Sequence, residues 1–219
     1  MSSIPGATGP FTFTPSSSGT QTSEFIAPLD LKEFGQLHEV PQSDFSVKGE
    51  ANSRTDVLFH IFDKDSKELG FVKIKLSPNW LEDEEFRKAD DIHKNLFKTN
   101  FLSDGTYIRL QRISISGKDE RGLKKVAKTL LQTLMEFAKK MNAENKIFGD
   151  LPFCATKRLH ELGMRYYSDE QYPTVEERAE VGQVRKHERV TIYLPDECAK
   201  KFNQRIKRTP IFPNAATVS

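Results

Sequence analysis

Two stretches of the sequence alternate apolar and polar residues with a period of two. Before a polar turn at residues 63–68 the apolar positions are Val57, Phe59 and Ile61, and after it they are Val72, Ile74 and Leu76. A period of two is typical of a strand with one buried face, because successive side chains point to opposite sides of a sheet. The pattern therefore predicts an antiparallel β-hairpin from Asp56 to Leu76.

A third strand is predicted from Tyr107 to Ser116, and its apolar pattern changes phase part-way along. The apolar positions are Ile108 and Leu110 before the change and Ile113 and Ile115 after it. Two interpretations are open: either the strand is buried on both faces, or an extra residue near Gln111 or Arg112 forms a β-bulge. A bulge would turn a backbone N–H group out of the ladder and make it available to a ligand.

A long amphipathic helix follows a basic loop at residues 117–122. Its apolar residues recur every three or four positions and are Leu123, Val126, Ala127, Leu130, Leu131, Leu134, Phe137, Ala138 and Met141. This spacing gathers them on one face of an α-helix, so a helix is predicted from Leu123 to Met141.

Other segments continue the alternation of strands and helices. We expect strands over residues 146–151 and 190–194, a helix over residues 154–162 that is capped by Gly163, and a last helix over residues 196–208. Helical spacing also predicts one short helix within residues 25–45 and one or two amphipathic helices within residues 78–101. Together these elements indicate an α/β domain.

The chain divides into three parts by composition. Residues 1–24 are rich in Ser, Thr, Gly and Pro and poor in apolar residues, which predicts a flexible leader. Residues 25–195 are expected to form one domain. Residues 196–219 are expected to form a basic helix followed by a tail that prolines interrupt.

Charge and hydropathy narrow the classes of partner. The 33 basic and 31 acidic residues leave a formal net charge of +2, so no global field would hold the chain on nucleic acid or on an anionic membrane. No apolar run approaches the roughly 20 residues that span a bilayer, and the N-terminus lacks the basic-then-apolar order of a signal peptide. Neither a nucleic-acid partner nor a membrane partner is expected.

Cysteine and histidine usage indicates the compartment. Cys154 and Cys198 do not make a disulfide scaffold, and the histidines fall at no metal-ligand spacing. These observations predict a cytoplasmic protein without a bound metal. The composition of the leader suits an inert tail, and it also suits a specialised export signal of a secreted effector.

Two motifs at the long helix and beyond it resemble the GNAT family of acetyl-CoA-dependent acyltransferases. Arg121-Gly122-Leu123-Lys124-Lys125-Val126-Ala127-Lys128-Thr129-Leu130-Leu131 resembles the family's Arg-Gly-x-Gly-x-Gly/Ala-x-x-Leu-Leu, and Leu159-His160-Glu161-Leu162-Gly163-Met164 resembles its Tyr-Glu-Lys-Leu-Gly-Phe. The order of elements over residues 56–194 also matches the family core. The resemblance implies a mixed, mostly antiparallel central sheet flanked by helices, and transfer of an acetyl group from acetyl-CoA to an amine of a protein or small molecule.

The resemblance also implies that acetyl-CoA binds where the third strand passes into the long helix. A helix N-terminus offers unpaired N–H groups and a partial positive charge, which suit a pyrophosphate. The residues assigned to cofactor binding are Ile113, Ser114, Ile115, Arg121, Gly122, Leu123, Lys124, Lys125, Val126 and Ala127.

Acetyl transfer to an amine needs a base for the amine proton and an acid for the departing thiolate. Glu68 and Glu188 are candidate bases because they lie at expected strand ends, and Tyr166 is a candidate acid near the second motif. We therefore assign Glu68, Glu188 and Tyr166 as candidate catalytic residues.

Four positions depart from the family pattern. Lys124 and Val126 replace glycines, Leu159 replaces the tyrosine, and Pro152 replaces an asparagine. These departures favour an alternative, a GNAT-like binding or scaffold module without turnover. Basic residues that flank an amphipathic helix are also commonly only its solvated face.

Overall fold

A computed structural model describes residues 32–53, 55–77, 106–143, 146–167 and 174–212 of the chain. Eight strands in these ranges form one sheet in the order β1-β2-β3-β4-β5-β6-β8-β7. The strands are β1 (His38–Glu39), β2 (Phe45–Ala51), β3 (Asp56–Asp63), β4 (Glu68–Ser77), β5 (Tyr107–Ile115), β6 (Ile147–Pro152), β7 (Arg165–Tyr166) and β8 (Arg189–Tyr193). The helices in these ranges are α3 (Glu120–Lys140), α4 (Phe153–Glu161), α5 (Val175–Glu180) and α6 (Asp196–Arg208).

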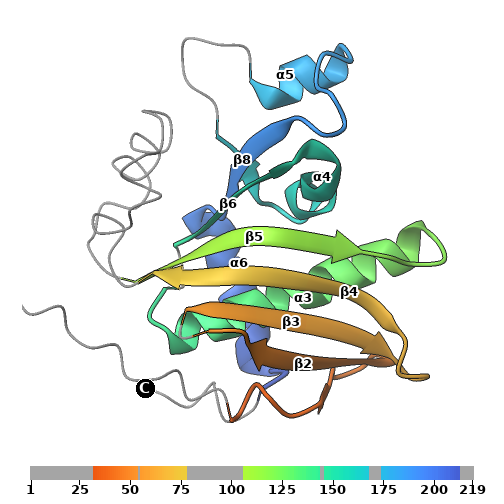
Figure 1. Ribbon diagram of the computed structural model, residues 1–219, viewed down its shortest axis with the longest axis vertical. Helices are drawn as coiled ribbons and strands as arrows, with labels where there is room; N and C mark the ends of the chain where they lie inside the picture. Colours follow the sequence, from red (N-terminus) through yellow and green to blue (C-terminus); the bar gives the residue numbers. More distant parts are fainter. Residues whose placement is uncertain (1–31, 54, 78–105, 144–145, 168–173, 213–219) are drawn as a thin grey trace, which may run out of the picture.

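The sheet is mixed but mostly antiparallel. β5 and β6 run parallel, and every other neighbouring pair in the described sheet is antiparallel. A parallel pair needs a crossover connection, and α3 supplies it between β5 and β6 (Figure 1). The predicted α/β class and the mixed, mostly antiparallel sheet flanked by helices are therefore confirmed.

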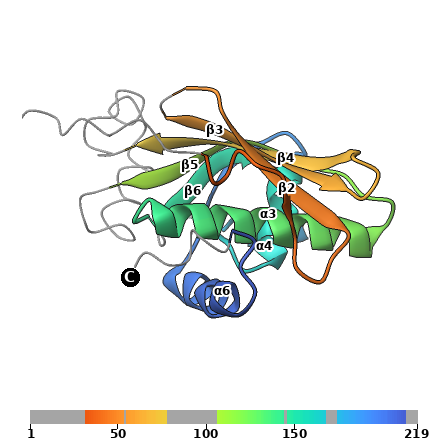
Figure 2. The same ribbon diagram turned by 90° about the horizontal axis from the view of Figure 1, so that it is seen from below.

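The long helix α3 lies at the centre of the core. It packs against β3, β4 and β5 on one side, and Figure 2 shows α6 on its far side. Covering on both sides explains why all residues from Thr129 to Ala138 are buried, including the polar Gln132, Thr133 and Glu136. Residues 198–212 contribute Cys198, Ala199, Phe202, Ile211 and Phe212 to the same core.

Most of the predicted elements are confirmed. The predicted hairpin is β3–β4, the third strand is β5 and the long helix is α3. The last helix, α6, has the bounds that were predicted for it. Gly163 follows α4 with a φ of +110°, as expected of a residue that ends a helix in the left-handed region.

The structure differs from the prediction at the N-terminal edge of the sheet. The expected short helix within residues 25–45 was wrong over its described part, where residues 32–35 form a turn and β1 and β2 follow. The side chain of Phe34 explains the difference, because it packs edge-on against Phe59, Phe137 and Phe212 and holds this turn in the core. The leader, the helices expected over residues 78–101 and the tail beyond residue 212 lie outside the described residues.

Candidate functional site

The parallel strands β5 and β6 separate half-way along their length. They pair at Ile108–Ile147, Arg109–Phe148 and Leu110–Gly149, and the pairing stops there. Beyond this point β5 continues to pair with β4, and β6 continues to pair with β8. Figure 1 shows β6 turning away from β5 toward α4. Beyond Leu110 and Gly149, the inner edges of the two strands thus have no strand partner among the described strands.

A β-bulge lies at the point of separation. On β4, Lys73 and Ile74 are adjacent, but their partners on β5 are Arg112 and Leu110, so Gln111 is the extra residue. The bulge interpretation of the sequence is therefore confirmed, and the phase change of β5 follows from it. Among the described residues, three buried side-chain oxygen atoms have no hydrogen-bond partner, and Gln111 Oε1 is one of them. A buried carbonyl oxygen without a donor costs free energy unless a ligand supplies one.

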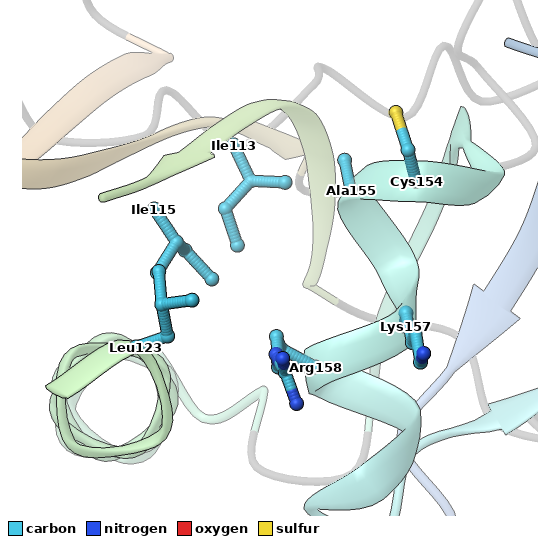
Figure 3. A pocket seen from close by; sticks show the side chains of 7 residues that line it. All are labelled: Ile113, Ile115, Leu123, Cys154, Ala155, Lys157 and Arg158. Atoms are coloured by element: carbon cyan, nitrogen blue, oxygen red, sulfur yellow. The ribbon is translucent and has the colours of Figure 1, made fainter. Parts of the chain in front are cut away.

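A pocket of about 300 Å³ opens between the end of β5, the first turn of α3 and α4. Figure 3 shows Ile113, Ile115 and Leu123 on one side of it and α4 on the other. The residues that α4 contributes are Cys154, Ala155, Lys157 and Arg158. The pocket therefore has an apolar wall on β5 and α3 and a wall on α4 that carries two cationic side chains.

The N-terminus of α3 is capped by an acidic residue. Asp119 is in extended conformation and its carboxylate accepts a hydrogen bond of 2.6 Å from the Gly122 amide. Glu120 occupies the first turn and forms an ion pair with Arg158 of α4. Carboxylates at a helix N-terminus stabilise the helix through its dipole, and they compete with any other anion for the same amides.

The structure divides the ten predicted cofactor-binding residues into three groups. Ile113, Ile115 and Leu123 line the pocket. Ser114, Arg121, Lys124 and Lys125 are exposed and do not belong to the described lining, and Gly122 is half-buried and held by the Asp119 cap. Val126 and Ala127 are buried in the core. The side chains of Val126 and Ala127 therefore pack against the domain and do not face the pocket.

The three candidate catalytic residues are absent from the pocket lining that the structure describes. Glu68 Oε2 lies 2.7 Å from His60 Nδ1, within hydrogen-bonding distance. Glu188 forms an ion pair with Arg178, which lowers the pKa of the Glu188 carboxyl and weakens it as a base. Glu188 does not line the pocket beside β5, but it lines a second pocket of about 540 Å³ together with Arg185, Lys186 and His187.

The surroundings of Tyr166 indicate a structural role. It is buried, its hydroxyl lies 3.1 Å from Thr156 Oγ1, and its ring stacks on His160 with centroids 4.6 Å apart. Burial raises the pKa of the Tyr166 hydroxyl, so this group holds its proton more tightly than an exposed tyrosine does. At the position of the family tyrosine, Leu159 is fully buried.

Sequence reasoning missed the residues that α4 brings to the pocket. Arg158 and Lys157 belong to no motif, and Arg158 is adjacent to Leu159, where the family motif begins. The loop at residues 186–188 accepts hydrogen bonds from the first amides of α4, namely Phe153 N to Glu188 O at 2.8 Å and Cys154 N to Lys186 O at 3.1 Å. These bonds fix the start of α4 beside the pocket.

Two further findings concern possible metal ligands and the lengths of the helices in the described segments. Within them, no group of three or more His, Cys, Asp or Glu side chains is placed to hold a metal ion. The helices of these segments are also too short or too polar to cross a bilayer.

Comparison with known proteins gives no family assignment. No family model matches the chain, and no curated protein matches it. Among solved structures 13 chains match. One of them is described as "Crystal structure of bacterial toxin"; it is 11% identical, has a TM-score of 0.41, and the match covers 69% of this chain and 72% of that chain.

Proposed function

We propose that the protein is a GNAT-like acyltransferase that moves an acetyl group from acetyl-CoA to an amine of a protein or small molecule. The observation that carries this proposal is the separation of β5 from β6 beyond Leu110 and Gly149, beside a pocket that leads to the first turn of α3. Such a slot suits the cofactor, because backbone groups that lack a strand partner can hydrogen-bond the amides of its extended arm and the thioester oxygen.

The residues around the slot suit the cofactor. The pantetheine arm of CoA carries amide N–H groups. Gln111, the bulged residue at which β5 stops pairing with β6, has a buried Oε1 without a donor among the described residues. The phosphate groups of CoA are anionic, and Arg158, Lys157, Arg121 and Lys124 are cations on α4 and on the first two turns of α3. The apolar wall of Ile113, Ile115 and Leu123 suits the aliphatic part of the arm.

The reaction places simple demands on this site. The deprotonated amine attacks the thioester carbonyl carbon, a C–N bond forms, the C–S bond breaks, and the thiolate takes up a proton. Backbone N–H groups on the inner edge of β5 stabilise the oxygen that becomes negative. Within the described lining no carboxylate faces the pocket, so we expect the amine proton to pass through water to a carboxylate outside it. Glu68 is the candidate, because the ion pair with Arg178 weakens Glu188 as a base.

Calorimetric titration with acetyl-CoA and with CoA tests the proposal. We expect both to bind, and we expect the double variant Arg121→Ala/Lys124→Ala to bind at least about tenfold more weakly because it loses two phosphate partners. The matched control is Lys200→Ala/Lys201→Ala, which removes two positive charges from exposed positions of α6. Absence of heat and of thermal stabilisation at high ligand concentration would refute the proposal.

Two observations favour a second candidate, a binding module without turnover. The carboxylates of Asp119 and Glu120 already occupy the N-terminus of α3, and the family tyrosine is replaced by a buried leucine, Leu159. An assay of acetyl transfer to a panel of amines separates the two candidates. Binding of acetyl-CoA without any product would support the module, and product formation would support the enzyme.

A further inference from the structure

Arg158 reaches across the mouth of the pocket. Arg158 belongs to α4 and lines the pocket, and Figure 3 shows its side chain on the side of α4 that faces the first turn of α3. There Nη1 and Nη2 of Arg158 contact Oε1 and Oε2 of Glu120, a residue 38 positions earlier in the chain. A second carboxylate, Glu161 of α4 itself, accepts a hydrogen bond of 2.6 Å from Nη1.

The contact between Arg158 and Glu120 uses the guanidinium as a fork. Two parallel N–H donors meet two oxygen atoms, which is the geometry that arginine also uses for phosphate. One guanidinium edge cannot serve a carboxylate and a phosphate at the same time. An anionic ligand that binds this edge of the guanidinium must therefore displace Glu120 from Arg158.

Displacement of Glu120 costs little. Its side chain is 72% exposed, whereas that of Arg158 is 20% exposed. An ion pair with one highly exposed partner contributes little to stability, because water screens the charges and the side chain loses freedom. Arg158 is thus held in place at the pocket by Glu161 and by packing, while Glu120 can turn into solvent.

We infer that Arg158 is the residue that binds the pyrophosphate of CoA, and that Glu120 is a built-in competitor that occupies its guanidinium until the cofactor enters. This inference rests on the proposed acyl-CoA site. It also assigns the phosphate contact to a side chain of α4. In the glycine-rich pattern the backbone approaches the phosphate, but here Lys124 and Val126 of α3 stand at two of the glycine positions. Because Glu120 competes for the guanidinium, the affinity for the cofactor is lower than it would be without this carboxylate.

Three variants test the inference by calorimetric titration with acetyl-CoA. Glu120→Gln removes the competitor and should bind several-fold more tightly, while Arg158→Gln should bind at least about tenfold more weakly. The double variant should match Arg158→Gln, because the effect of Glu120 passes through Arg158. Arg158→Lys keeps the charge but loses the fork, so it should also bind more weakly than the wild type.

Controls separate this inference from long-range charge effects and from failure of the proposed function. Glu39→Gln changes the charge by the same amount at the opposite edge of the sheet and should leave the affinity unchanged. If the wild type binds acetyl-CoA and Glu120→Gln and Arg158→Lys bind it with the same affinity, the inference is overturned. The proposed acyl-CoA site is then unaffected. No binding by the wild type and none by Glu120→Gln would remove the proposed function, and the inference with it.

Discussion

Gly70 of β4 makes room for Val126 of α3. A β-carbon at position 70 would lie 3.1 Å from Val126 Cγ1 and 2.7 Å from the backbone oxygen of Ser114. The absence of a side chain at Gly70 therefore allows the close approach of α3 to the sheet at Val126.

We expect Gly70→Ala to destabilise the protein by about 1–3 kcal/mol, because overpacking forces the helix or the strand to move. Val126→Ala should relieve only the contact with the side chain, since the Ser114 oxygen belongs to the backbone. The double variant should therefore show a positive but incomplete rescue in a double-mutant cycle measured by urea denaturation. Strict additivity would show that the two residues do not share this space.

Gly163 and Gly182 offer a second comparison. Both have positive φ, +110° and +71°, but a β-carbon at 163 would lie 2.9 Å from Cys198 Sγ while one at 182 would meet nothing within 4 Å. Gly182→Ala should cost about 1 kcal/mol for its backbone alone, and Gly163→Ala should cost more because it also displaces Cys198. Equal losses in thermal or chemical denaturation would mean that the Cys198 contact is unimportant.

The partnerless oxygen of Gln111 predicts opposite effects on stability and on binding. Gln111→Leu removes a buried acceptor that has no donor, so the free energy of unfolding should stay the same or rise. The affinity for acetyl-CoA should fall if that oxygen accepts a hydrogen bond from the cofactor. Denaturation and calorimetry on the same variant provide the check, and a fall in stability with unchanged affinity would contradict both expectations.

Glu136 predicts a dependence of stability on pH. Burial raises the pKa of its carboxyl, partly offset by hydrogen bonds from the amides of Ile211 and Phe212 and from Gln132. Because the folded pKa lies above the unfolded one, the contribution of Glu136 to stability is full below the unfolded pKa and is lost as the pH rises through the folded pKa.

The difference in unfolding free energy between wild type and Glu136→Gln should therefore shift against the wild type as the pH rises above 4.5, the ordinary pKa of a glutamate carboxyl. Glu188→Gln serves as the control of opposite sign, because the ion pair with Arg178 lowers the pKa of Glu188 and its contribution is lost as the pH falls through the folded value. Parallel curves for wild type and Glu136→Gln would contradict the prediction.

Much of the fold could be predicted because the relevant signals are local. The alternation of Val57, Phe59 and Ile61 defines β3, and the change of phase at Gln111 identifies the bulge. β2 could not be found in this way, because Gly49 interrupts its apolar alternation. A β-carbon there would lie 2.8 Å from Phe59 Cε1, so the glycine is needed for packing that only the tertiary structure creates.

The candidate site was predictable on one side only. The side formed by β5 and α3 could be predicted from the basic loop before α3, and Ile113, Ile115 and Leu123 do line the pocket. The other side depends on how α4 folds back across the sheet, which brings Arg158 to Glu120 although they are 38 residues apart. No pattern of periodicity or composition encodes that contact, so its charge could not be anticipated.

The amides of Ile211 and Phe212 donate to the buried Glu136 carboxylate at 2.8–3.0 Å, across 75 and 76 residues of chain. Phe212 also lies against Phe34, at the opposite end of the described chain. During synthesis on the ribosome, β3, β4, β5 and α3 emerge well before these partners do. The nascent chain therefore lacks the amide donors of residues 211 and 212 for this carboxylate until residue 212 leaves the exit tunnel, and completion of the core has to wait for that moment.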